Sequence, residues 1–203
     1  MNQPHRFKVL LTALGGILLL NGLLGTQWLF DGASHFSETA GSWEFATFQR
    51  VYLLCLVLLA VLIPGLREIR AASGTRLSPT VLTALSGAIV LQAGTVFTMA
   101  FVAPFYAETA PATLDATNGG SFQLAMTAVW VLFGASLVAL GVSAFRTKVL
   151  PRSAGLLIIV GAVITPILGP IGSLAIGAAF LRAGLGLRRG TDAMAPATEP
   201  LAA

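Results

Sequence analysis

Apolar residues fill long blocks of the chain, and short segments richer in polar and charged residues separate these blocks. Blocks of this length are typical of transmembrane helices, which need about 20 apolar residues to cross the hydrocarbon core of a bilayer. The pattern therefore predicts an all-α membrane protein. The blocks are residues 9–30, 51–66, 81–105, 122–145 and 154–187.

The last block is too long for one straight helix across a membrane. As a single helix it would extend roughly 50 Å, whereas the hydrocarbon core is about 30 Å thick. Gly169 and Pro170 lie near its middle, and proline breaks the helical hydrogen-bond ladder while glycine permits a tight turn. We therefore predict two short helices, 154–168 and 171–187, joined by a Gly-Pro turn, which completes a bundle of six transmembrane helices.

The basic residues favour six spans and orient them. If the N-terminus is cytoplasmic and every block crosses once, all of the 12 Lys and Arg residues except Arg50 fall on the cytoplasmic side. This is the positive-inside pattern of membrane proteins. Five spans would place Arg188 and Arg189 outside, so we predict that both the N-terminus and the C-terminus are cytoplasmic.

The chain is predicted to contain one domain. Residues 1–189 form the transmembrane helical domain, and residues 190–203, rich in Ala, Pro and Thr, form a disordered cytoplasmic tail. A cleaved signal peptide is the alternative for the first block, but the block is longer than a usual h-region and no A-x-A site follows it. The abundance of Arg, Ala and Gly suggests a GC-rich bacterial genome, so the expected location is the bacterial inner membrane, with a multi-pass topology.

The composition excludes several classes of protein. Hydrophobic residues make up 56% and charged residues 10% of the chain, whereas an ordinary soluble domain is about 25% charged. The basic residues are spread over connecting segments rather than gathered in one patch, so the expected partners are membrane lipids and not nucleic acid. Cys55 is the only cysteine, which excludes an internal disulfide, a CxxC redox pair and a thiolate zinc site.

One segment carries a family resemblance. Residues 136–163 read SLVALGVSAFRTKVLPRSAGLLIIVGAV, a helix that ends in basic residues, then Leu-Pro-Arg, then an apolar helix led by glycine. This arrangement resembles uncharacterised bacterial multi-spanning membrane proteins of the domain-of-unknown-function class. The resemblance covers about a third of the chain and implies a fold type, with no known active residues.

The apolar blocks hold no Asp, Glu, Lys or His, and Arg182 is the one charge inside them. Proton-coupled pumps and intramembrane hydrolases need buried ionisable groups, so we predict no catalytic residues and no cofactor. Arg182 is close enough to the cytoplasmic end of its helix to extend to the headgroups. His35, with Asp31, Glu38 and Glu44 in the same loop, could hold a metal ion, but a solvated loop is the favoured interpretation and no metal site is predicted.

Asn21 and Gln92 are predicted to form a polar pair at the midplane. Both lie at similar depth in helices that run outward, and an unpaired amide is costly in hydrocarbon. We therefore expect the two side chains to face each other across the first and third helices. They either hold the helices together or form a polar ligand or permeation site.

Small residues recur at helical spacing on three of the predicted helices. Such stripes let helix backbones approach closely, and they allow two interpretations: packing within one chain, which we favour, or the contact face of a homo-oligomer. The stripes are Ala175, Ala179 and Ala183, Gly134 and Gly141, and Gly87 and Gly94.

Most of the aromatic residues map to the outer half of the predicted bundle. Aromatic belts normally mark both membrane interfaces, so we predict an outward-facing apolar cleft for a hydrophobic small molecule, with Arg50 at its mouth to hold a phosphate or headgroup. The other predicted ligand-binding residues are Trp28, Trp43, Phe48, Phe101 and Tyr106. An ordinary aromatic belt facing lipid is the alternative.

Three functions are compatible with these features. The favoured one is a non-enzymatic membrane protein that binds a hydrophobic ligand or a membrane partner from the outer leaflet. The second is a small transporter or channel subunit that uses the midplane amides. An intramembrane enzyme is the third, disfavoured because acid–base groups are missing from the apolar blocks.

Overall fold

A computed structural model describes residues 3–28, 35–71, 73–117 and 120–192, with the backbone alone described for 3–4, 27–28, 167 and 187–192. The described residues form helices and no β-strand. The elements are α1 (Gln3–Trp28), α2 (Phe36–Gly41), α3 (Trp43–Glu68), α4 (Pro79–Phe97), the π-helical turn η1 (Thr98–Val102), α5 (Ala103–Thr109), α6 (Pro111–Thr117), α7 (Ser121–Thr147) and α8 (Arg152–Asp192).

Five helical segments are long and apolar enough to cross a membrane: His5–Thr26, Trp43–Glu68, Pro79–Thr109, Ser121–Thr147 and Leu168–Gly186. The prediction of a helical protein with several membrane-length apolar helices is therefore confirmed. A sixth apolar segment, Arg152–Pro166, is shorter. Below, Arg152–Pro166 is called the first arm of α8 and Leu168–Gly186 the second arm.

The helix ends follow local sequence signals. The side chain of Ser42 accepts a hydrogen bond from the backbone N–H of Phe45 (3.2 Å) and so caps the start of α3. Pro79 occupies the first turn of α4, where its missing N–H costs nothing. Lys148 has φ 56° and ends α7 in the left-handed conformation.

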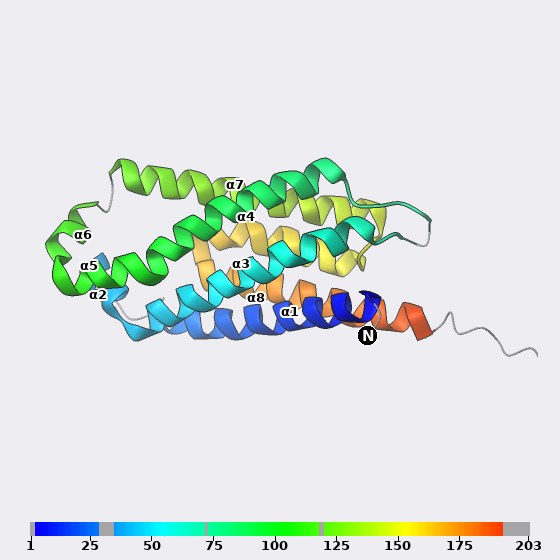
Figure 1. The fold of residues 1–203 in the computed structure, drawn as a ribbon, viewed down its shortest axis with the longest axis horizontal. Coiled ribbons are helices and arrows are strands. Elements are labelled where there is room, and N and C mark those ends of the chain that lie inside the picture. Colours follow the sequence, from blue (N-terminus) through cyan, green and yellow to red (C-terminus); the bar gives the residue numbers. More distant parts are fainter. Residues whose placement is uncertain (1–2, 29–34, 72, 118–119, 193–203) are drawn as a thin grey trace, which may run out of the picture.

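The two arms of α8 lie side by side. Helical geometry is lost at Leu168 (φ −130°, ψ 49°), directly before the Gly169-Pro170 pair where the sequence predicts a turn. A Cβ atom on Gly161 in the first arm would lie 2.8 Å from the carbonyl oxygen of Gly172 in the second. The chain therefore folds back on itself at this point, as the orange and yellow parts of the ribbon show (Figure 1).

Close packing at glycine holds the long helices together. The second arm packs against α1, where a Cβ atom on Gly177 would lie 2.9 Å from the carbonyl oxygen of Gly15. The first arm packs against α7, where a Cβ atom on Gly141 would lie 2.8 Å from the carbonyl oxygen of Gly155. α3 packs against both α1 and α4, and α4 packs against α7.

The small-residue stripes divide into two groups. Ala179 and Ala183 are fully buried, and Gly141 packs within the chain as the favoured interpretation requires. Gly87 and Gly94 on α4 are different, because a Cβ atom on either would meet no atom within 4 Å. These two glycines face away from the rest of the described chain.

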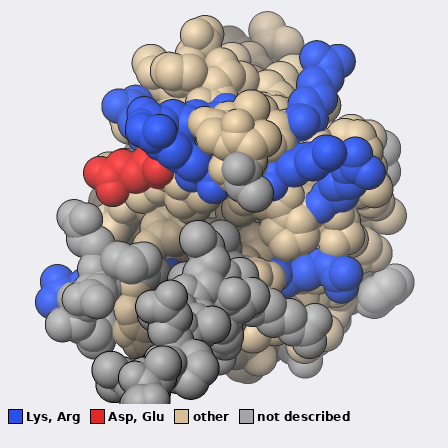
Figure 2. All heavy atoms as spheres, turned by 90° about the vertical axis from the view of Figure 1, so that its right-hand side faces the viewer, with Lys and Arg blue, Asp and Glu red and all other residues tan. Residues whose placement is uncertain are grey.

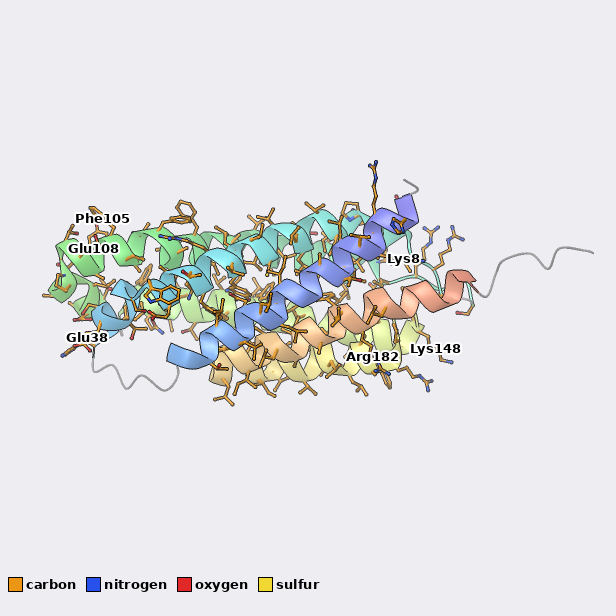
Figure 3. All side chains as sticks on the ribbon, turned by 90° about the horizontal axis from the view of Figure 1, so that it is seen from below. Lys8, Glu38, Phe105, Glu108, Lys148 and Arg182 are labelled. Carbon is orange, nitrogen blue, oxygen red and sulfur yellow. The ribbon has the colours of Figure 1, made fainter. Side chains whose placement is uncertain are left out.

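The bundle has two unlike ends. We call one the basic end, since Lys8, Lys148 and Arg182 lie toward it, and Lys and Arg side chains surround the face seen in Figure 2. We call the other the capped end, where α2, α5 and α6 cover the ends of the long helices (Figure 1). Glu38 and Glu108 lie at the capped end, far from the three basic residues (Figure 3).

Candidate functional site

An apolar cavity of about 250 Å³ lies at the capped end. An apolar cavity of about 150 Å³ holds a molecule the size of benzene, so this one has room for a larger hydrophobic group. Two of its aromatic lining residues, Tyr106 and Phe122, are 41% and 43% exposed, so the cavity is not sealed from the surface. The lining residues are Phe36 from α2, Thr98, Met99 and Val102 from η1, Ala103 and Tyr106 from α5, Thr113, Leu114 and Thr117 from α6, and Phe122 from α7.

A small cluster of buried side chains lies where the wall of the cavity meets α3. Phe45, Ala103 and Leu114 are buried together, and the ring of Phe45 meets the ring of Phe36 edge-on at 6.1 Å between centroids. α5 ends before Ala110, whose backbone is not helical (φ −151°, ψ 60°). The chain therefore turns, and α6 lies back over α2 and α5.

The π-helical turn η1 supplies one wall of the cavity. Its backbone N–H groups bond five residues back, as that of Ala103 does to the carbonyl of Thr98, and Pro104 next in the chain cannot donate such a bond. The wider turn directs Met99 and Val102 into the cavity. Single π-helical turns inside α-helices occur frequently at functional sites.

The hydroxyl groups of two threonines at the cavity are already satisfied. Thr98 donates to the carbonyl oxygen of Gly94 (3.1 Å), and Thr117 donates to that of Leu114 (2.7 Å). These hydroxyls therefore offer a ligand little hydrogen bonding, and most of the remaining lining is hydrocarbon. The cavity suits an apolar group rather than a polar one.

Asp115 fastens α6 to the start of α2. Its carboxylate accepts hydrogen bonds from the backbone N–H of Ser37 (2.8 Å) and from the Ser37 hydroxyl (2.9 Å), and His35 Nδ1 lies 4.0 Å away. The backbone hydrogen bond is the main reason that the pKa of Asp115 is lowered, with partial burial opposing it and the Ser37 hydroxyl and His35 adding to it. His35 therefore lies beside Asp115, a residue that the metal hypothesis did not include; Asp31 is outside the described residues.

Protonation of Asp115 is expected to loosen the capped end. A carboxyl whose pKa is lowered by folding stabilises the fold above its unfolded pKa, about 3.9, and loses that effect as pH falls through the folded pKa. Asp115→Asn mimics the protonated group, so at neutral pH it should speed hydrogen exchange of the α2 and α6 amides severalfold. Glu108→Gln removes an exposed carboxylate at the same end and is the control. Equal exchange in the two variants would contradict the role of Asp115.

The predicted ligand-binding residues lie in different environments. Tyr106 lines the cavity, while Trp43 is 67% exposed. The guanidinium carbon of Arg50 lies 5.3 Å from the ring centroid of Phe101, so these two contact each other, but neither lines the cavity described above. The Trp28 side chain lies outside the part that the structure describes.

Phe48 belongs to the packed interior rather than to the cavity. Its ring is buried and stacks on Tyr52, with 6.2 Å between centroids, and Tyr52 stacks in turn on Trp130 at 6.2 Å. A Cβ atom on Gly25 would contact the Phe48 ring at 2.7 Å. Phe48 therefore helps to join α1 to α3.

The sequence did not identify most of the cavity's lining. Met99, Val102 and Leu114 are ordinary apolar residues that do not indicate a binding site in a sequence. They lie together only because α6 folds over α5. Phe36 and Phe122 do line the cavity, and both belong to the outer aromatics that the sequence singled out as a group. The available signals were that aromatic excess, Pro104 just after the π-helical turn, and Pro111 just after the break at Ala110.

Asn21 and Gln92 are both fully buried, as predicted, but they do not hydrogen-bond to each other. Neither amide has a hydrogen-bond partner among the described residues, and the same holds for the carbonyl oxygen of Gln49. The reason is the packing order: α1 lies against α3 and α8, whereas α4 lies against α3 and α7. The equal depth that the sequence predicts for the two amides does not make their helices neighbours.

Comparisons of this chain with protein-family models, with curated proteins and with solved structures found no match. The fold and its cavity therefore define only a structural class: a helical protein with several membrane-length apolar helices and an apolar cavity under a cap of short helices.

Proposed function

We propose that the chain is a six-span protein of the bacterial inner membrane, with both termini in the cytoplasm. Five membrane-length helices and the shorter first arm of α8 supply the spans. Lys8, Lys148 and Arg182 gather toward one end (Figure 3), and such a bias marks the cytoplasmic side. The second arm of α8 returns to the basic end, from which the first arm began. The C-terminus is therefore cytoplasmic whether or not the turn at Leu168 crosses the whole membrane.

Cysteine labelling tests this topology. In a Cys55→Ser background, Ser73→Cys and Lys148→Cys represent the basic end and Glu108→Cys the capped end, and all three positions are exposed. A membrane-impermeant maleimide added to intact cells should label only Glu108→Cys, and permeabilised cells should show labelling of all three. Labelling of Lys148→Cys in intact cells would reverse the orientation and contradict the proposal.

We infer that the cavity at the capped end binds an apolar ligand from the outer leaflet, such as a lipid acyl chain or an isoprenoid. The observation that carries this function is the hydrocarbon-lined cavity itself, whose lining includes the exposed aromatic residues Tyr106 and Phe122. Aromatic rings give a ligand large apolar contact area at low cost in conformational entropy. Arg50, on α3, is exposed at the same half of the bundle and could pair with a headgroup.

A photoactivatable fatty acid tests this binding. With the purified protein in detergent, labelling should saturate, should map to peptides of η1, α5 and α6, and should be displaced by an unlabelled fatty acid. The exposed surface of α4 around Val90, which is 71% exposed, is the internal reference for non-specific contact. Labelling that does not saturate and is as strong around Val90 as at η1 would rule out a specific site.

A small transporter or channel subunit is the second candidate. The observation in its favour is that the buried amides of Asn21 and Gln92 and the side-chain carbonyl oxygen of Gln49 have no hydrogen-bond partner among the described residues. Such groups are normally satisfied by water or by a polar ligand. Solute flux in proteoliposomes that falls in Asn21→Leu, and that persists when the capped-end cavity is filled, would favour this function over ligand binding.

A further inference from the structure

A second concave surface lies on the other half of the molecule, toward the basic end. It is a groove of about 720 Å³ whose floor is the second arm of α8 and whose walls come from α1 and the first arm. Leu19, Leu157, Ala178 and Leu185 supply much of its apolar lining, and Arg182 is the charged residue among the described side chains that line it.

The groove runs along the second arm from the middle of the bundle toward the basic end. At its inner limit, a Cβ atom on Gly177 would lie 2.8 Å from the backbone nitrogen of Leu19. At its other limit, a Cβ atom on Gly186 would lie 2.8 Å from Cγ of Pro151, next to the start of the first arm. The nine residues from 178 to 186 rise about 12 Å along a helix, close to the thickness of one leaflet of hydrocarbon, about 15 Å.

Arg182 presents a cation to this groove. Its side chain is exposed, and no carboxylate among the described residues forms an ion pair with it. An arginine within an apolar helix is costly unless it meets an anion or water. Arg182 lies toward the basic end, as Lys148 does (Figure 3).

We propose that this groove binds one anionic phospholipid from the leaflet at the basic end. The guanidinium of Arg182 holds the phosphate through two parallel N–H···O bonds, and an acyl chain lies along Leu157 and Ala178 toward Leu19. The apolar walls select a lipid of the bilayer over free phosphate, because a free anion gains nothing from them. This site is separate from the cavity at the capped end and does not depend on it.

Native mass spectrometry of protein released from nanodiscs tests the proposal. The nanodiscs contain equal amounts of phosphatidylglycerol and phosphatidylcholine, and the variants are Arg182→Gln, Ala178→Phe and the control Arg146→Gln, which removes an exposed arginine near the same end. The wild type should retain one phosphatidylglycerol in preference to phosphatidylcholine. Arg182→Gln should reduce that preference about fivefold, since one basic residue near an anionic membrane surface contributes on the order of 1 kcal/mol.

The variants separate this site from general attraction to a basic surface. Ala178→Phe keeps the charge but fills the floor of the groove, so it should reduce retention of both lipids, while Arg146→Gln should behave as the wild type. Equal losses in Arg182→Gln and Arg146→Gln, or equal retention of the two lipids by the wild type, would overturn the proposal. So would displacement of the bound lipid by millimolar inorganic phosphate, which would assign the site to a free anion.

Discussion

Replacing Gly177 with leucine is expected to abolish the folded protein or to destabilise it severely. A Cβ atom at this position would lie 2.8 Å from the backbone nitrogen of Leu19 and 2.9 Å from the carbonyl oxygen of Gly15. Both are backbone atoms of α1, so neither can move without separating the two helices. Overpacking a tight contact typically costs 1–3 kcal/mol, and here a whole side chain would enter a gap too small for one methyl group.

Gly94→Leu is the matched control, because a Cβ atom there meets nothing within 4 Å. It should leave the midpoint of unfolding in detergent nearly unchanged, since the new side chain faces away from the described chain. The measurement is that midpoint, followed by size-exclusion chromatography of the extracted protein. Equal unfolding midpoints for Gly177→Leu and Gly94→Leu would contradict the close packing of α1 on the second arm of α8.

Filling the cavity at the capped end is expected to remove its ligand. Val102 lines the cavity and is 37% exposed, so Val102→Trp can place a large ring in the space without disturbing the buried cluster around Ala103 and Leu114. Displacing two or three methylene groups of a ligand from the cavity weakens its binding free energy by about 2 kcal/mol, because each buried methylene contributes about 0.8 kcal/mol. Saturable labelling by the photoactivatable fatty acid should therefore fall at least about tenfold.

The control for this experiment is Val90→Trp. Val90 is also a valine, on the adjoining helix α4, but it is 71% exposed and does not line the cavity. Labelling at η1, α5 and α6 should stay at the wild-type level in this variant. Undiminished labelling in Val102→Trp, with the variant folded as judged by its unfolding midpoint, would show that the ligand binds elsewhere.

The long helices could be predicted from the sequence because their signal is local. A block of apolar residues defines a membrane-length helix wherever its neighbours lie. Helical geometry fails at Leu168, directly before Gly169 and Pro170, while the Gly-Pro turn and the six spans stay predictions. Lipid exposure and burial require similar apolar residues, however, so the pattern does not say which face of a helix meets which neighbour. This is why the equal depth that the sequence predicts for Asn21 and Gln92 did not reveal that α1 and α4 pack against different neighbours, α8 and α7.

The capped end depends on contacts between distant parts of the chain. Asp115 and Ser37 are 78 residues apart, and neither belongs to a motif that would pair them. The short helices α5 and α6 are bounded by Pro104 and Pro111, which the sequence displays, but the cavity arises only when α6 folds back. The aromatic residues also predicted one cleft around Arg50, but composition does not say which way a ring points: Tyr106 lines the cavity, whereas Arg50 and Phe101 do not.

The central claim is that an apolar ligand occupies the cavity at the capped end, and an experimental structure in a lipid nanodisc tests it most directly. The account predicts continuous, elongated density beside Met99, Val102 and Tyr106, of a length and shape that no side chain of the protein can explain, and absent from Val102→Trp. A cavity that is filled by ordered water bonded to the threonine hydroxyls, or that closes because α6 packs onto η1, would contradict it.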